Sequence, residues 1–591
     1  MLKRLFILLC VALVGVGAVV LFAVVNDRID SEAPVATVVD QETPNDHVEA
    51  IVSSHELATE AGFEVLAMGG TAADAAVAVA ATLSVVEPWF SSVLGGGTWA
   101  LYYDASQERV TSLDGVGPTG SLASVADYAE RAGEPGMHQA IVPGAWDGWM
   151  VWLREYGELD LGDVLAPAIR IAREGHPASE GMVEWLSRQR SQTFARPATA
   201  EIYFPGGTML SAGETVYQHD MAETFESLVR AYDAARGEGR EVAIQAARDH
   251  FYRGPIAESI VAFSEQQSGY LIRSDFENFA TDLVEPISIE YGDDITVYQN
   301  PPNSQGITML IGLGILDGYN LSQYASLSAD SIHLMAEAIK LAFTDRHFHV
   351  GDPARVSVPV EGLLSDTHAA QQRARIDMNQ AMTWPIADGF EPLDPDLGNT
   401  TTFHVTDRFG NGAAVTTSLG AQFFVVPNTG IHINHRMRFL AIDDGPNQVA
   451  PGFKVRHTSN PYMAFRDGRL SILGGNTGAD SQSQGQIQQF VGVVHQGLSA
   501  QEAVARPRFI STAFPSTVYS YQIRNTLQLE EGHPDEVIAN LRDRGHDVTI
   551  GDGTWGSANM IVLIDEGRDA DMGVDPRTEV SYAKKDWADE G

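Results

Sequence analysis

The stretch GNTTTFHVTDRFGNGAAVTTS, residues 398–418, predicts a β-hairpin whose first strand begins with threonines. Apolar residues alternate with polar ones after the threonines, Gly-Asn at 410–411 is a hairpin signal, and the return strand ends at Ser418. A hairpin folded about positions 409–410 pairs residues whose numbers sum to about 818–819. Thr400 or Thr401 is therefore predicted to lie opposite Ser418.

Two facing hydroxyls at the start of a strand have a possible chemical role. A hydroxyl is a weak nucleophile and needs an adjacent base. If the peptide bond before the threonine were cut, the new α-amine, with a pKa of about 7.7–8.0, would supply that base at neutral pH. The alternative is structural, because threonine is β-branched and common in strands.

The rest of the chain has an α/β pattern. A helix over 72–86 is apolar nearly all round, which predicts burial in a large core. A loop over about 380–399 contains three prolines and separates this first part from a strand-rich second part. Other predicted elements are strands over 50–53, 99–103 and 110–113, a helix over about 57–68, and a long helix around 333–344.

Composition excludes several classes of protein. Lys and Arg number 38 against 78 Asp and Glu in 591 residues, a net charge of −40. Such an acidic surface repels phosphate backbones, so no nucleic-acid partner is expected. The single cysteine, Cys10, lies near the N-terminus, so the body has no disulfide, thiolate nucleophile or Cys-ligated metal.

The N-terminus predicts a targeting segment. Lys3 and Arg4 precede an uncharged stretch over 5–25, which is long enough to span a bilayer and longer than most signal-peptide cores. Positive residues on the short side place the body on the periplasmic or extracellular side, held to the membrane through residues 5–25. The alternative is a cleaved signal and a secreted or periplasmic protein. Residues 26–46 are predicted to be a linker.

Ten short motifs occur in an order and spacing that cover most of the chain. Together they resemble the γ-glutamyltranspeptidase family of N-terminal-nucleophile hydrolases from about Val48 to Lys584. The matching segments are Ser54–Gly62, Gly69–Ala78, Leu94–Gly97, Val142–Gly144, Pro301–Gly306, Met335–Ala338, Ala342–Arg346, Gly351–Pro353, Gly556–Ser557 and Asp575–Arg577.

The resemblance implies an α+β fold, a four-layer αββα sandwich made as one precursor that cuts itself. The implied cut lies between Asn399 and Thr400, seven residues before Asp407. It would divide the body into a large chain, residues 47–399, and a small chain, residues 400–591, which share one core. No cofactor is implied.

The resemblance also assigns catalytic roles. Thr400 would be the nucleophile and its α-amine the base, and Ser418 would be the second hydroxyl, where the family has threonine. The backbone N–H groups of Gly478 and Ala479 would form the oxyanion hole. Ala479 replaces the family's second glycine, but a backbone donor does not depend on that side chain.

The residues that bind glutamate in the family are not retained. Its arginine is missing from Leu113–Pro118, and its asparagine after the second hydroxyl is Gly420. The family residues that bind the α-amino group of glutamate correspond to positions near Arg436 and Arg438 in this sequence. The family's paired serines correspond to His457-Thr458. An arginine repels an ammonium group and binds a carboxylate instead. The alternative is that the two arginines are only solvated charges on a strand.

We therefore expect an amidase or acyltransferase whose small-molecule substrate is an amide of an acyl group without an α-amine, such as a glutaryl group. The alternatives are a γ-glutamyltransferase or glutathione hydrolase with altered contacts, and a processed but inactive binding protein. No metal site is predicted, because Asp345–His349 lacks the H-E-x-x-H spacing of zinc enzymes.

Overall fold

The computed structural model describes residues 47–131, 133–384, 400–420, 423–518, 523–551, 553, 555–578 and 581–586, all in the compact unit from Asn45 to Gly591. The predicted anchor (5–25) and linker (26–46), Asn399 and most of the proline-containing loop lie outside the described residues. Within the described ranges, no helix is both long and apolar enough to cross a membrane.

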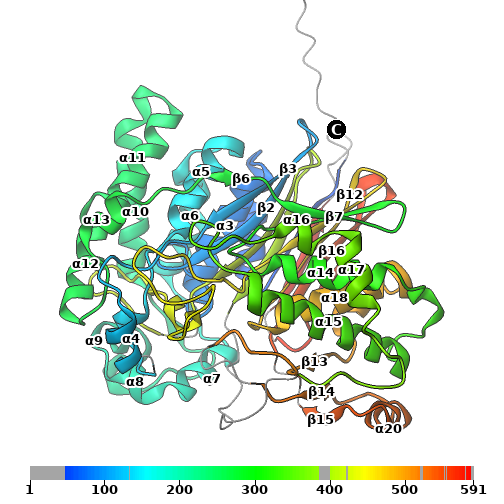
Figure 1. Ribbon diagram of the computed structural model, residues 1–591. Helices are drawn as coiled ribbons and strands as arrows, with labels where there is room; N and C mark the ends of the chain where they lie inside the picture. The colour runs from blue at the N-terminus through cyan, green and yellow to red at the C-terminus, as the bar shows by residue number, and fades with distance from the viewer. Residues whose placement is uncertain are drawn as a thin grey trace, which may run out of the picture. The chain divides into compact units, whose positions relative to one another are not determined.

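Two antiparallel sheets form the centre of the fold (Figure 1). The first sheet has seven strands in the order β18 (Tyr582–Asp586), β1 (Glu49–Ser53), β9 (Thr401–Thr406), β10 (Gly412–Ser418), β2 (Gly97–Asp104), β3 (Arg109–Gly115) and β6 (Leu283–Val284). The second sheet has six strands in the order β17 (Asp569–Val574), β16 (Ala558–Ile564), β12 (Arg469–Asn476), β11 (Tyr462–Arg466), β8 (Ile295–Gln299) and β7 (Ile287–Tyr291).

The two sheets face each other across an apolar core. Side chains of both sheets, among them Val52 and Leu101 from the first and Met463, Leu473 and Ile561 from the second, form one buried cluster. Strand β9 contributes Thr402 and His404 to this interface and Phe403 and Val405 to the opposite face. All six residues of β9 are buried, because helices cover its outer face as well.

Helices pack on the outer face of each sheet, which gives the order helix, sheet, sheet, helix (Figure 1). Those on the first sheet include α2 (Glu56–Ala67), α3 (Ala72–Val86), α5 (Ala145–Tyr156), α6 (Leu161–Glu174), α10 (His219–Ala235) and α11 (Arg240–Tyr252). Those on the second sheet include α14 (Gly306–Asp317), α15 (Ala329–His349) and α18 (Ser481–Gln496). The predicted α+β class is confirmed.

Helix α3 shows how the sequence fixes a central element. All fifteen of its residues are buried, as its apolar composition predicts. Thr71 and Asp74 form a capping box, and Asp407 accepts a hydrogen bond from the N–H of Ala72 at 2.7 Å. The helix start is thereby tied to the turn of the β9–β10 hairpin, and its end, at Glu87, reaches the other end of β9.

A smaller sheet consists of β13 (Phe509–Ser511), β14 (Thr526–Glu530) and β15 (Asp547–Gly551). Its strand β13 packs against α15 and α18, and α20 (Asp535–Asp543) lies beside β15, while α19 (Ala500–Ala505) packs on β16 and β17 of the second sheet. The long helix predicted around 333–344 is longer than expected. Ser328 caps its N-terminus through the N–H of Ser331, and the helix continues to His349.

Candidate active site

The two hydroxyls predicted to face each other are in contact. Thr400 Oγ1 lies 2.9 Å from Ser418 Oγ, and both residues are buried. Strands β9 and β10 pair Thr401 with Thr417, so the register places Thr400 rather than Thr401 opposite Ser418. This confirms the predicted hairpin pairing and selects Thr400 from the two threonines.

Side chains alternate across β9, so its first threonines face different layers. Thr402 faces the second sheet, where a Cβ on Gly475 would come within 2.1 Å of its hydroxyl. Thr401 faces the helices, where its hydroxyl contacts Ser54 and Glu87. Thr400 therefore shares the face of Thr402 and points toward the end of β12.

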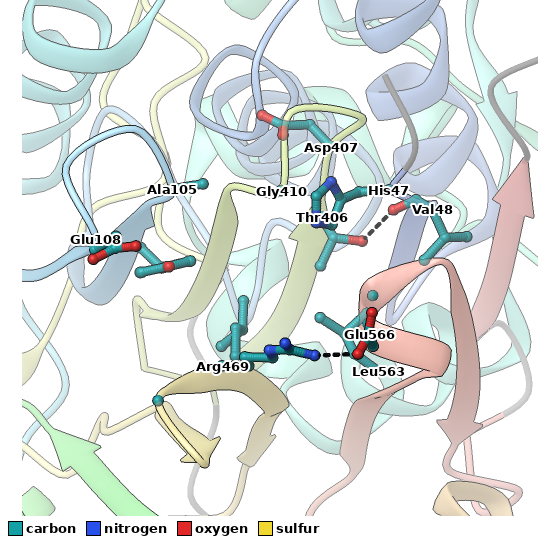
Figure 2. A pocket seen from close by; sticks show the side chains of 14 residues that line it. His47, Val48, Ala105, Glu108, Thr406, Asp407, Gly410, Arg469, Leu563 and Glu566 are labelled. Carbon is teal, nitrogen blue, oxygen red and sulfur yellow. Dashed lines mark hydrogen bonds and ion pairs between the residues drawn. The ribbon is translucent and has the colours of Figure 1, made fainter. Parts of the chain in front are cut away.

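The far end of the hairpin is closed by a buried carboxylate. Asp407 accepts hydrogen bonds from the backbone N–H groups of Phe409, Asn411 and Ala72, and burial raises its pKa to about 6. A cavity of about 320 Å³ lies at this end, beside Thr406 (Figure 2). The six residues of β9 separate it from Thr400 by roughly 20 Å, so it is not the space beside the Thr400 hydroxyl.

The predicted oxyanion donors lie in the turn that follows β12. Gly478 and Ala479 both have positive φ values, +96° and +48°. A Cβ on Gly478 would lie 2.2 Å from the carbonyl oxygen of Trp555, so only glycine fits there. Within the described residues neither backbone N–H donates a hydrogen bond, which leaves both donors available to a ligand.

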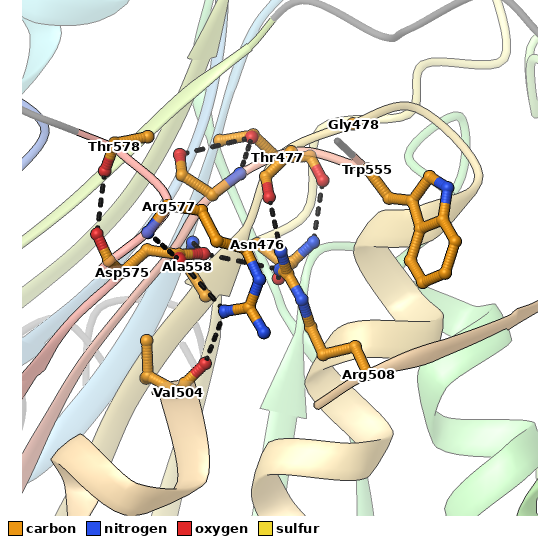
Figure 3. A network of polar contacts seen from close by, with 12 residues as sticks. Asn476, Thr477, Gly478, Val504, Arg508, Trp555, Ala558, Asp575, Arg577 and Thr578 are labelled. Carbon is orange, nitrogen blue, oxygen red and sulfur yellow. Dashed lines mark hydrogen bonds and ion pairs between the residues drawn. The ribbon is translucent and has the colours of Figure 1, made fainter. Parts of the chain in front are cut away.

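A polar network holds the turn after β12 in place (Figure 3). The N–H of Thr477 donates to the carbonyl of Ser557, whose own N–H donates to Thr477 Oγ1, each at 2.7 Å. Arg508 donates to Asn476 Oδ1 and to the carbonyl of Gly556, and it pairs with Asp575. The turn is thus fixed before any substrate binds, as an oxyanion site requires.

Gln305 was not singled out by the sequence, yet it connects two parts of the site. Its Nε2 donates to the carbonyls of Thr458 and Ala479, each at 3.1 Å, and its Oε1 accepts from buried Arg346 at 2.8 Å. The Pro301–Gly306 motif that contains it could have indicated this role. The adjacent residue Ser304 also holds the segment that contains Thr458, because its hydroxyl donates to the carbonyl of Ser459.

Arg436 and Arg438 do not lie on a strand. They belong to a short 3-10 helix, η5 (Arg436–Phe439), and Arg436 is only 1% exposed. Its guanidinium lies 5.0 Å from the centre of the Phe439 ring. The alternative of solvated strand charges is therefore wrong for Arg436, because a turn draws its side chain into the interior.

His435 fills the space beside Gly420. A Cβ on Gly420 would lie 2.0 Å from the His435 ring, and the φ of Gly420 is +102°. Arg438 donates to His435 Nε2 at 3.0 Å, and since arginine can only donate, the neutral ring carries its proton on Nδ1. That Nδ1 has no hydrogen-bond partner among the described residues. Burial, with Arg438 and Arg436, holds the pKa of His435 well below its usual value.

His457 and Thr458 lie on the segment that Gln305 anchors. His457 Nδ1 accepts from the N–H of Ser459, so its ring proton is on Nε2, which is buried and unpartnered in the described part of the chain. Burial, with the charge of Arg436, lowers the pKa of His457 well below its usual value. Arg436 acts on both His435 and His457, so these three side chains are brought together.

The segment 113–118, which is predicted to lack the family's arginine, is apolar around Val116. Val116 is fully buried and packs in one cluster with Trp99, Met437 and Val455. A Cβ on Gly97, the residue paired with Ser418, would lie 3.1 Å from Val116. The wall beside the hydroxyl pair is therefore hydrocarbon rather than guanidinium.

One group of possible metal ligands occurs among the described residues, away from this site. His333, Glu337 and His546 lie close together and buried, and His333 Nδ1 is 2.8 Å from His546 Nε2. Lys340 Nζ lies 2.6 Å from Glu337 Oε1. Lys340 and Glu337 of α15 thus form a buried ion pair beside the two histidines, one of which, His546, lies outside α15.

A family model described as Gamma-glutamyltranspeptidase matches residues 58–584. The chain belongs to the gamma-glutamyltranspeptidase family. It is accordingly an enzyme of this family, an amidohydrolase of the N-terminal-nucleophile type.

Relatives within the gamma-glutamyltranspeptidase family include both acylases and glutathione hydrolases. The Acylase ACY 1 proenzyme of Pseudomonas sp. (strain SE83) is 30% identical over 535 residues, 88% of this chain and 90% of that protein. The glutathione hydrolase-like YwrD proenzyme of Bacillus subtilis (strain 168) is 32% identical over 537 residues, 89% of this chain and 96% of that protein. The crystal structure of cephalosporin acylase from Bacillus halodurans has a TM-score of 0.79 at 28% identity, over 91% of this chain and 96% of that one.

Proposed function

We propose that this enzyme cuts its own chain between Asn399 and Thr400. Thr400 Oγ1 attacks the carbonyl carbon of Asn399, the C–N bond breaks, and the nitrogen takes up a proton to become the α-amine of Thr400. Water then hydrolyses the ester and leaves a carboxylate on Asn399. The proposal is supported by the contact between Thr400 and Ser418 and by the proenzyme names of the relatives.

In the mature enzyme the α-amine accepts the proton of Thr400 Oγ1 as that oxygen attacks a substrate amide. The N–H groups of Gly478 and Ala479 stabilise the oxyanion, and Ser418 holds the Thr400 hydroxyl. The leaving amine takes the proton, an acyl ester remains on Thr400, and water or an acceptor amine releases the acyl group.

We propose that the acyl group carries a carboxylate and no α-amine. The observation that carries this proposal is the buried group of Arg436, His435 and His457, which brings one cation together with two ring N–H groups that have no acceptor among the described residues. Arg438 acts on this group indirectly, by fixing the tautomer of His435. These donors match a carboxylate and repel an ammonium. Thr458, whose hydroxyl is also unpartnered in the described chain, adds one more donor.

The test compares glutaryl and γ-glutamyl p-nitroanilides on the matured enzyme. We expect kcat/KM to be roughly ten- to a hundredfold higher for the glutaryl compound, since each lost ion pair costs about 1.5–3 kcal/mol. Arg436→Met should remove this preference, whereas Arg436→Lys should keep part of it because the charge remains. A preference for the γ-glutamyl compound would contradict the proposed substrate.

The second candidate is a glutathione hydrolase with altered contacts. The 32% identity to the glutathione hydrolase-like protein of Bacillus subtilis favours it. The same assay separates the two candidates, because a glutathione hydrolase requires a site for the α-ammonium group and would release p-nitroaniline faster from the γ-glutamyl compound.

A further inference from the structure

Behind the nucleophile lies a buried carboxyl group that the proposed mechanism does not use. Glu87 ends α3, is 6% exposed, and its Oε2 accepts hydrogen bonds from Ser54 Oγ at 2.5 Å and Thr401 Oγ1 at 3.0 Å. Ser54 Oγ and Thr401 Oγ1 are themselves 2.6 Å apart. Three oxygens from α3, β9 and the residue after β1 thus form a closed triangle.

The three contacts of this triangle determine how many protons its three oxygen atoms must carry together. Three oxygen–oxygen contacts at hydrogen-bond distance require three protons, and the two hydroxyls supply only two. All three contacts are satisfied when Glu87 Oε2 carries a proton and donates it to one hydroxyl, this hydroxyl donates to the other, and the other donates back to Oε2. One contact becomes repulsive when Glu87 is a carboxylate. Independently, burial raises the pKa of Glu87 to about 7, which the hydrogen bonds from Ser54 and Thr401 only partly oppose. No charged side chain of the described residues contributes to this shift.

The link from Glu87 to Thr400 is covalent and short. Thr401 is the first residue of β9, and its backbone determines the direction of the Thr400 side chain toward Ser418. The contacts that hold Thr401 on the helix side of the sheet therefore also hold its neighbour Thr400, the proposed nucleophile, on the other side of the sheet. A displacement of about 1 Å at such a point can lower a rate a hundredfold.

We propose that Glu87 is a positioning residue, which in its protonated form holds Thr401 and thereby aligns Thr400 for self-cleavage and for attack on substrate. The inference rests on the proposed function only in taking Thr400 as the nucleophile. Ionisation of Glu87 loosens the triangle, so the alignment weakens as the pH rises through about 7.

The experiment measures the rate at which freshly purified full-length chain is converted into two chains, by gel, from pH 5 to pH 9. Glu87→Ala and Thr401→Val should slow conversion about tenfold or more, while Glu87→Gln and Thr401→Ser should stay within about threefold of wild type at pH 6. The glutamine amide nitrogen, at the position of Oε2, can donate to both hydroxyls at every pH while one hydroxyl donates to the other. The rate of Glu87→Gln relative to wild type should therefore rise between pH 6 and pH 8.

Asp74→Asn serves as the matched control. Asp74 is a second buried carboxyl group on α3, at the opposite end of the helix, with a pKa also raised by burial. A thermal melt measures any destabilisation of α3 in this variant, and its conversion rate relative to wild type should not depend on pH across this range. Thr401→Val removes one hydroxyl at nearly constant volume, so it tests the triangle if Glu87→Ala does not fold.

Two results would overturn the proposal: conversion of folded Glu87→Ala at the wild-type rate, or a constant ratio of Glu87→Gln to wild type from pH 6 to pH 8. Failure of the proposed function has a different signature. In that case Thr400→Ala would still be cleaved, or the small chain would begin elsewhere, whatever the behaviour of the Glu87 variants.

Discussion

Replacing Gly420 by alanine tests whether His435 occupies the space of the side chain that the family carries at this position. The added Cβ would lie 2.0 Å from the His435 ring, and two carbon atoms in contact are about 3.5 Å apart. The ring must therefore move by about 1.5 Å in a buried site. A φ of +102° at residue 420 adds strain for any residue with a side chain.

The expected cost has two separable parts. Overpacking of a buried site costs about 1–3 kcal/mol, and backbone strain costs about 1–3 kcal/mol. Gly420→Ala should therefore lower the free energy of unfolding by about 2–6 kcal/mol. In a His435→Ala background the clash disappears and only the strain remains, so the same change should cost about 1–3 kcal/mol less.

The assay is urea denaturation of four proteins, all carrying Thr400→Ala so that each is a single chain. The difference between the two backgrounds is the coupling energy of residues 420 and 435. A coupling below about 0.5 kcal/mol would show that the ring does not fill this space, since that is the ordinary scatter between independent sites.

Further predictions concern maturation, strain, pH and location. Thr400→Ala should remain a single chain on a gel, whereas the wild type should yield fragments 1–399 and 400–591, the second identified by N-terminal sequencing. Ala479→Gly should raise the free energy of unfolding by about 1 kcal/mol in urea, because alanine at a φ of +48° is strained. Burial lowers the pKa of His404 and His432 to about 3, so both stay neutral in the fold. Their stabilising effect is present above pH 6.5 and is lost as the pH falls below it, by up to about 1.4 kcal/mol per unit for each, which melting curves from pH 5 to pH 8 would detect. Cell fractionation should find the large chain on membranes through residues 5–25, and a soluble large chain starting near residue 26 would show a cleaved signal instead.

The hairpin and its hydroxyl pair could be predicted because they depend on local rules. Residue alternation and the Gly-Asn turn fix which residues of β9 and β10 are opposite, and the contact between Thr400 and Ser418 follows from that register. Helix α3 was predictable for a similar reason, since a segment that is apolar all round is buried.

The environment of the arginines could not be predicted in the same way. Whether Arg436 is exposed depends on the turn that carries it and on neighbours distant in the sequence, such as His457. The position of His435 in the site could not be predicted for the same reason, because it depends on contacts with Gly420 and Arg438. Glu87 is 314 residues away from Thr401, and no periodicity connects them.

The strand order of the first sheet has a consequence for refolding. Strand β1 lies between β18 and β9, and β10 lies against β2, so segments from before and after residue 400 alternate across the sheet. The uncut chain brings these segments together as one molecule, at a rate independent of protein concentration. Once cut and unfolded, the two pieces must find each other by diffusion and thread strands of one between strands of the other. Self-cleavage would thus turn a reversible folding equilibrium into a kinetically trapped assembly, whose lifetime depends on its unfolding rate.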